Sequence, residues 1–202
     1  MGFDKDMHHN IEHRNDAIKW AKNVLAITNE WVILDTETTG IGKDDVVIQI
    51  GIIDLDKNIL IDSLVRPTRW KSIPAEATNI HGITMDMLSS APTLSGILDH
   101  LMEIIRRKRT IMYNAEFDRR VLNQTIYQDN INILEGEMIT NFECAMTYYS
   151  RFIGQWSDYQ QNYVYQKLPS SEHSAIGDCK ATLEIIKIMA VGDTMLFPKI
   201  TK

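Results

Sequence analysis

The sequence has little of what marks several common protein classes. Its 202 residues include two cysteines, Cys144 and Cys179, which are too few for a disulfide scaffold and fit a reducing compartment. No apolar run approaches the roughly 18 residues that a membrane-spanning helix needs. The N-terminus also lacks the basic start and the apolar stretch of a secretory leader. We therefore expect a cytoplasmic protein that does not contact a membrane.

An excess of positive charge is missing as well. Lys and Arg number 21 against 27 Asp and Glu, so the formal net charge is −6. This balance disfavours a protein that holds duplex DNA by charge alone, because such binding needs a basic surface. It does not exclude an enzyme whose carboxylates act on nucleic acid through bound cations. The 44% share of hydrophobic residues suffices for one packed domain.

Hydrophobic periodicity predicts a mixed α/β fold. The expected elements, in chain order, are helix 11–28, strands 31–34, 46–55 and 59–65, helix 94–109, strand 110–113, helix 117–126, strand 138–142, helix 145–152 and a last helix after Ser174. A loop is expected from Arg66 to about Ser90, with a short helix that Thr84 caps. Three antiparallel strands followed by alternating helices and strands predict a mixed sheet flanked by helices.

Four carboxylates fall at strand ends or helix starts, where functional sites of α/β sheets gather. Asp35 and Glu37 stand two apart at the end of the first strand, so the strand period puts both on one face. Asp118 begins the helix after the fourth strand, and Asp178 lies in the first turn of the last helix. We expect these four side chains to converge.

Converged carboxylates repel one another unless they bind protons or cations. Ligation by oxygen alone favours Mg²⁺ or Mn²⁺. Two such ions can clamp the attacking and leaving oxygens of a phosphodiester. His173 precedes Ser174, the expected N-cap of the last helix, and is placed to act as a base beside the carboxylates. Taken singly, each of these residues is more often a cap or a solvated surface group.

The run from Asp35 to Gly40 is more specific than any single residue. Five specified positions of this kind arise by chance on the order of once in ten thousand chains of this length. This run, DTETTG, is followed in order by three further segments: HGIT at 81–84, NAEFD at 114–118, and HSA at 173–175 with Asp178 after it. With these motifs, residues 31–190 resemble the histidine subclass of the DEDD-superfamily 3′–5′ exonucleases, especially the proofreading epsilon subunits of bacterial DNA polymerase III and their phage-borne relatives.

The resemblance implies a ribonuclease-H-like fold and phosphodiester hydrolysis with two divalent cations, Mg²⁺ or Mn²⁺. It also implies roles for individual residues. Asp35, Glu37, Asp118 and Asp178 would be the metal ligands and His173 the general base. The substrate-binding residues that it implies are Thr36, Thr38, Gly40, His81, Asn114 and Phe117. Gln49 departs from the Glu that many family members carry.

The predicted function is therefore removal of nucleoside 5′-monophosphates from the 3′ end of single-stranded or frayed nucleic acid, with DNA favoured over RNA. One alternative is an exoribonuclease of the same superfamily that trims RNA 3′ ends. Another is a nucleic-acid-binding module without catalysis. We divide the chain into an N-terminal tail and helix (1–30), the exonuclease domain (31–190) and a C-terminal tail (191–202).

For three features of the sequence, two interpretations remain open. The N-terminal helix either docks on the domain or binds a polymerase or another replication or repair partner. The aromatic residues of segment 156–165 either stack single-stranded bases or close the core. Arg119, Arg120 and the basic run 106–109 either contact phosphates or are simply solvated.

Overall fold

The computed structural model describes residues 3–132, 141–169 and 173–194. Within these residues, the main sheet has five strands in the order β3-β2-β1-β4-β5. Their bounds are β1 (Trp31–Thr38), β2 (Val47–Asp54), β3 (Ile59–Leu64), β4 (Arg109–Met112) and β5 (Phe142–Cys144). The β1–β2 and β2–β3 pairs are antiparallel, and the β1–β4 and β4–β5 pairs are parallel. The predicted mixed sheet is confirmed.

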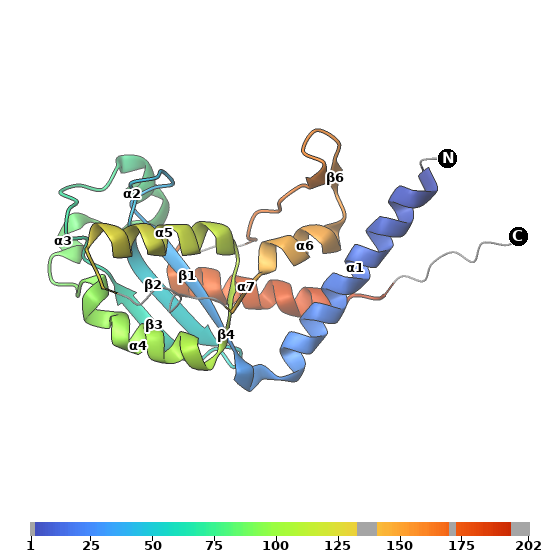
Figure 1. The fold of residues 1–202 in the computed structure, drawn as a ribbon, viewed down its shortest axis with the longest axis horizontal. Helices are drawn as coiled ribbons and strands as arrows, with labels where there is room; N and C mark the ends of the chain where they lie inside the picture. The colour runs from blue at the N-terminus through green and yellow to red at the C-terminus, as the bar shows by residue number, and fades with distance from the viewer. Residues whose placement is uncertain (1–2, 133–140, 170–172, 195–202) are drawn as a thin grey trace, which may run out of the picture.

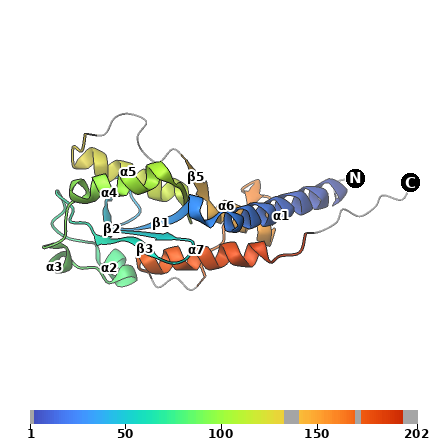
Figure 2. The ribbon, with the colours of Figure 1, turned by 90° about the horizontal axis from the view of Figure 1, so that it is seen from below.

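Helices cover both faces of this sheet. On one face lie α4 (Leu94–Arg107) and α5 (Ala115–Gln128), and on the other lies α7 (Ala175–Ala190), with α1 (Phe3–Ala26) and α6 (Ala145–Ile153) beside it (Figures 1 and 2). Successive side chains of β1 alternate between the two layers: Val32 and Leu34 pack with α4 and α5, and Ile33 packs with α1 and α7. The central strand is therefore buried on both faces.

Strand β1 continues beyond its apolar run. The sequence predicts a strand over 31–34, but β-pairing with β2 persists through Asp35 and Glu37 to Thr38. The antiparallel pairing with β2 keeps these polar residues extended, whereas the parallel pairing with β4 ends at Ile33. This extension holds Asp35 and Glu37 on a rigid strand.

The N-terminal helix begins earlier than its periodicity predicts, at Phe3 instead of residue 11. Ala17, Ile18, Ala21 and Val24 are fully buried in the cluster that α6 and α7 share. The Trp20 ring stacks on Tyr148 of α6, with 4.0 Å between centroids. Once this half is anchored, adding helical turns at its N-terminal end needs no new nucleus. Docking on the domain, one of the two expected roles of this helix, is thus observed.

The connection from β3 to α4 is more ordered than expected. Besides α3 (Met85–Leu88), whose predicted cap Thr84 accepts a hydrogen bond from the Met87 amide at 3.4 Å, it contains α2 (Ala75–His81). The expectation of a loop was wrong here. Helix α2 buries only Ala77 of its seven residues, so it has no apolar period to recognise. It ends at Gly82, whose φ of +72° places it in the left-handed conformation common after helices.

Smaller elements complete the described chain. A 3₁₀ turn, η1 (Thr28–Glu30), links α1 to β1, and β6 (Trp156–Ser157) pairs with β7 (Asn162–Tyr163) in a hairpin that no sequence pattern predicted. Strand β5 starts at Phe142, whereas the predicted strand covered 138–142; residues 138–140 lie outside the described residues. Across the described ranges, none of the helices combines the length and apolarity that crossing a bilayer requires.

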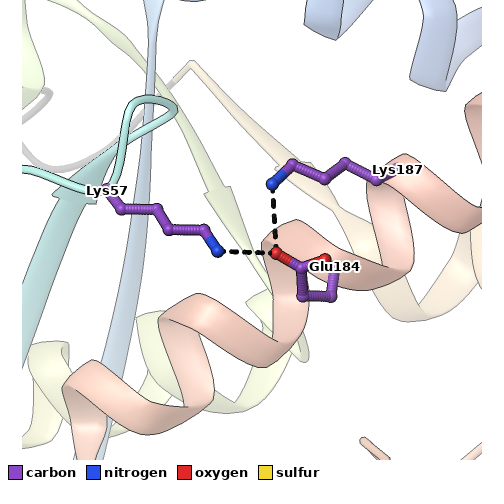
Figure 3. Close-up of polar contacts among 3 residues, drawn as sticks. All are labelled: Lys57, Glu184 and Lys187. Carbon is purple, nitrogen blue, oxygen red and sulfur yellow. Dashed lines mark hydrogen bonds and ion pairs between the residues drawn. The ribbon is translucent and has the colours of Figure 1, made fainter.

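Helix α7 is also tied to the sheet at its surface. Glu184 Oε1 lies 2.9 Å from Lys57 Nζ, in the turn between β2 and β3, and 3.0 Å from Lys187 Nζ (Figure 3). The two ammonium groups lower the pKa of the Glu184 carboxyl. All three side chains are exposed, so solvent screens these ion pairs and they add little to stability. The position of α7 therefore depends on its buried face.

Candidate active site

The four predicted carboxylates meet in one pocket. Asp35 and Glu37 from β1, Asp118 from α5 and Asp178 from α7 all line a cavity of about 600 Å³, together with His173. Carboxylate oxygens of Asp35, Glu37 and Asp178 lie within 4.8 Å of one another. The predicted convergence is therefore seen, although 143 residues separate Asp35 from Asp178 in sequence.

The start of α7 is held against the sheet by backbone contact. A Cβ added at Gly51 of β2 would lie 2.7 Å from the carbonyl carbon of Ala175, so only glycine allows this approach. The Ala175 amide donates to Gln49 Oε1 at 3.2 Å. Ser174 is the N-cap, as predicted, and its hydroxyl accepts from the Gly177 amide at 3.2 Å. These contacts place Asp178 beside β1.

Asp118 is positioned by the strand next to it. It is 3% exposed, and its Oδ1 accepts a hydrogen bond of 2.7 Å from the Thr36 hydroxyl. Helix α5 is in turn fixed to β2, because the Val47 amide donates to Thr125 Oγ1 at 2.9 Å. The side chain of Thr36 thus orients a carboxylate, and its backbone borders the pocket between Asp35 and Glu37.

Burial and mutual repulsion shift the acid–base behaviour of the carboxylates. Desolvation, followed by repulsion from Asp178 and Asp118, raises the pKa of Glu37 to about 7. Desolvation also raises the pKa of Asp118 to about 7, against the opposing hydrogen bond from Thr36. Burial, and then the charges of Asp118, Asp178 and Glu37, raise the pKa of Asp35 well above its ordinary value. The site favours bound positive charge, whether protons or cations.

His173 lines the pocket and has a left-handed backbone conformation. Its φ is +50°, in the left-handed region that a side chain with a Cβ seldom adopts. Such strain is found mainly where the surrounding structure imposes it, often at functional sites. The residue directly precedes the Ser174 cap and lines the pocket together with the carboxylates.

The remaining predicted residues divide into two groups. Asn114 and Phe117 line the same cavity as the carboxylates, whereas Thr38, Gly40 and His81 do not. The Thr38 hydroxyl donates to the Gly40 carbonyl at 2.7 Å, which closes the turn after β1.

His81 lies close to the pocket edge. Burial lowers its pKa, the Thr38 backbone opposes that effect, and the nearby His173 lowers the pKa further. Its Nδ1 accepts from the Ile83 amide at 3.0 Å. His81 is therefore a neighbour of His173 at the border of the site.

One wall of the pocket was not predicted. It is the segment from Tyr165 to Leu168, which follows the β6–β7 hairpin and faces Tyr113. The Tyr113 hydroxyl donates to the Gln166 carbonyl at 2.5 Å, and the Val164 amide donates to the Gln155 carbonyl at 2.8 Å. The segment has no period, so the aromatic residues were its only sequence signal.

Those aromatic residues take different roles. Tyr163 is buried and its hydroxyl lies 2.9 Å from His13 Nδ1 of α1, so it closes the core. Tyr165 is 57% exposed and borders the pocket. Tyr159, at the tip of the hairpin, is 97% exposed. Closure of the core is therefore observed for Tyr163, and the stacking of bases by the exposed aromatic residues stays a prediction.

Comparison with known proteins bears on this arrangement. The sequence profile of the Exonuclease family, of the RNase T type, matches residues 32–186. The chain belongs to this family. An exonuclease of Escherichia phage 186 is 34% identical over 192 residues, which cover 87% of this chain and 93% of the phage protein. The predicted resemblance to DEDD exonucleases is thereby confirmed, and with it the expectation of a hydrolytic nuclease.

The chain is also similar to a polymerase subunit in sequence and to a solved exonuclease in structure. The DNA polymerase III epsilon subunit of Rickettsia conorii is 34% identical over 101 residues, covering 47% of this exonuclease and 43% of the subunit. The structure of Exonuclease X in complex with 5′ overhanging duplex DNA aligns with a TM-score of 0.52 and 26% identity, over 81% of this chain and 95% of that one. The ribonuclease-H-like fold expected from sequence agrees with this alignment. The chain spans less than half of the polymerase subunit.

Proposed function

We propose that this exonuclease removes nucleotides one at a time from the 3′ end of single-stranded or frayed DNA and releases nucleoside 5′-monophosphates. The observation that carries the proposal is the meeting of Asp35, Glu37, Asp118, Asp178 and His173 in one cavity of about 600 Å³. The likeness to Exonuclease X, whose structure contains DNA, supports DNA as the substrate class.

The donor set fits two divalent cations of the Mg²⁺ or Mn²⁺ type. All four side chains offer carboxylate oxygens, and three of them lie within 4.8 Å of one another. The raised pKa values of Asp35, Glu37 and Asp118 reflect negative charge that the protein itself leaves uncompensated. When bound, two such ions neutralise this charge and polarise the scissile phosphate. Asp118 would hold its ion with the geometry that the Thr36 hydroxyl gives it.

The residues of the chain supply the remaining chemistry. We assign to His173 the removal of a proton from the attacking water as oxygen bonds to phosphorus. The bond from phosphorus to the 3′ oxygen of the preceding nucleotide then breaks, and that oxygen takes up a proton from solvent. Asn114 and Phe117 would contact the departing nucleotide, and the backbone of 36–40 would hold it, with His81 on the adjoining surface.

The test is a time course on 5′-labelled single-stranded DNA with Mg²⁺, with and without EDTA, beside an RNA of the same sequence. A descending ladder on DNA that EDTA abolishes is the expected result. Shortening of RNA in preference to DNA would replace the substrate assignment with RNA 3′-end trimming. If both strands bind and stay intact in Mg²⁺, the protein is a binding module and the proposal is wrong.

We further propose that residues 31–190 form the exonuclease unit, that 1–30 and 191–202 flank it, and that the protein acts in the cytoplasm. The side chains of Ala17, Ile18, Trp20, Ala21 and Val24 of α1 are buried within the chain itself. A polymerase or another replication or repair partner would consequently have to contact the opposite side of this helix.

A further inference from the structure

Two more hollows adjoin the active-site pocket. The first, of about 500 Å³, shares Asn114, Phe117, Met146 and Tyr165 with that pocket. The second, of about 540 Å³, shares Glu116, Arg119 and Arg120 with the first. The three cavities thus form one continuous depression. We call the two outer ones, lined by residues of α5 from Glu116 to Tyr127, the α5 groove.

Helix α5 provides the floor of this groove with one of its faces. The residues that line its far end stand three or four apart along the helix: Glu116, Arg119, Arg120, Asn123, Gln124 and Tyr127. Side chains at this spacing form a single stripe. Eleven residues rise about 16 Å along a helix, so the stripe has room for up to about five stacked nucleotides at ~3.4 Å each.

The two arginines of the stripe serve different purposes. Arg120 donates to the carbonyls of Ile41 at 3.2 Å and Gly42 at 3.0 Å, and so fastens the loop after β1 to α5. Arg119 lies with its guanidinium carbon 4.2 Å from the centroid of the Phe142 ring. A guanidinium placed over an aromatic ring keeps its N–H groups available to a phosphate. Together with Glu116, these residues give the stripe a net charge of +1 in a chain of net charge −6.

An exposed aromatic side chain stands at the end of the stripe. Tyr127 is 83% exposed and lines the outer hollow. Aromatic rings beside a cationic track are typical of surfaces that bind single strands without reading their sequence, because every base has a face to stack.

We propose that the α5 groove binds the nucleotides that precede the two joined by the scissile bond, with Arg119 contacting a phosphate and Tyr127 stacking a base. This inference depends on the proposed function, because a 3′ end held at the carboxylates requires its chain to leave the pocket, and the groove is continuous with the pocket wall. Arg107, in the basic run at the end of α4, is not part of the α5 groove. It pairs with Glu103 at 3.2 Å and lines none of these cavities.

The experiment compares kcat/KM on a dinucleotide, which occupies the catalytic pocket alone, with kcat/KM on an octanucleotide, which also reaches the groove. Arg119→Gln should lower kcat/KM on the octanucleotide about 10-fold and change it less than about 2-fold on the dinucleotide. Its dependence on log salt should become shallower by about 0.7, the value for one phosphate contact of a single strand. Tyr127→Ala should lower octanucleotide kcat/KM about 5-fold or more.

Arg107→Gln is the matched control, because it removes the same charge from an exposed site outside the groove. If Arg119→Gln and Tyr127→Ala match this control on the octanucleotide, the α5 groove does not bind substrate. Equal losses on both substrates would likewise overturn the inference, since Arg119 would then act at the catalytic pocket.

If the proposed function itself is wrong, the unmodified protein will hydrolyse neither substrate. Anisotropy of a labelled octanucleotide in EDTA then tests the groove by itself. Weaker binding by Arg119→Gln than by Arg107→Gln would support the groove, and equal binding would refute it.

Discussion

The floor and the far wall of the active-site pocket are built in different ways. The floor carries Asp35, Glu37, Asp118 and Asp178 on strand β1 and on the first turns of α5 and α7. The wall, residues 165–168, has no regular structure and is held by single hydrogen bonds such as that from the Tyr113 hydroxyl to the Gln166 carbonyl. By this difference, the proposed chemistry would be built on rigid elements, and the fit of the proposed substrate would depend on a segment that can change with little loss of stability.

The largest effect is expected from removing one carboxylate of the floor. Asp35→Asn should lower kcat at least about 1000-fold, because the charge that attracts the cations is lost. Since Asp35 repels its neighbours, the metal-free variant should melt at the same or a higher temperature than the unmodified protein. Asp99→Asn, which removes an exposed charge on α4, is the control. Turnover of the Asp35 variant at the normal rate would refute the role of the floor.

Loss of the base should be less severe. His173→Ala is expected to lower kcat about 100-fold or more while the binding of Mn²⁺, measured by calorimetry, is retained. A variant that keeps the kcat of the unmodified protein would exclude His173 as the base.

The rigidity of the floor can be tested at Gly51. An alanine there would bring its Cβ to 2.7 Å from the Ala175 backbone, so α7 and Asp178 must shift. We expect a loss of about 2 kcal/mol in the free energy of unfolding, a fall in Tm of roughly 4–8 °C, and reduced activity. Gly96→Ala in α4 is the matched control, because its nearest contact would be an ordinary 3.4 Å. Equal Tm values for both variants would show that the close approach is unimportant.

Metal removal should make the stability of the floor depend on pH. In the folded state the pKa of Glu37 and that of Asp118 are about 7, above their values in the unfolded chain. The folded protein therefore binds protons that the unfolded chain has lost, and its stability in EDTA should fall as pH rises from about 4.5 through about 7. Melting curves at about pH 5.5 and pH 8 should differ by ~5 °C or more, and Mg²⁺ should restore the Tm at the higher pH. A Tm in EDTA that is constant over this range would contradict the expectation.

The smallest effect is expected at the wall. Tyr113→Phe removes the hydroxyl that holds the Gln166 carbonyl, and should cost about 1 kcal/mol in stability. We expect KM for DNA to rise several-fold with little change in kcat, because the floor is untouched. Tyr159→Phe, at an almost fully exposed position, is the control. A fall in kcat as large as that of the His173 variant would mean that wall and floor act together.

Local patterns predicted some of these features and missed others for identifiable reasons. The buried apolar run of β1 and the cap at Ser174 involve neighbours in sequence, and both were predicted. Helix α2 was missed because burial of Ala77 alone leaves no period. The hairpin β6–β7 was missed because strands of two residues are shorter than any recognisable pattern.

By itself, the sequence determined the inventory of the site: two carboxylates two apart on a strand, two more at helix starts, and a histidine before a capped helix. These features depend on spacing along the chain, which periodicity and capping make readable. Only the tertiary structure decided that Gly51 lets α7 approach the sheet, that Thr36 orients Asp118, and that one face of α5 extends the pocket into a groove. Those arrangements depend on which elements pack together, and packing between residues far apart in the chain leaves no local pattern.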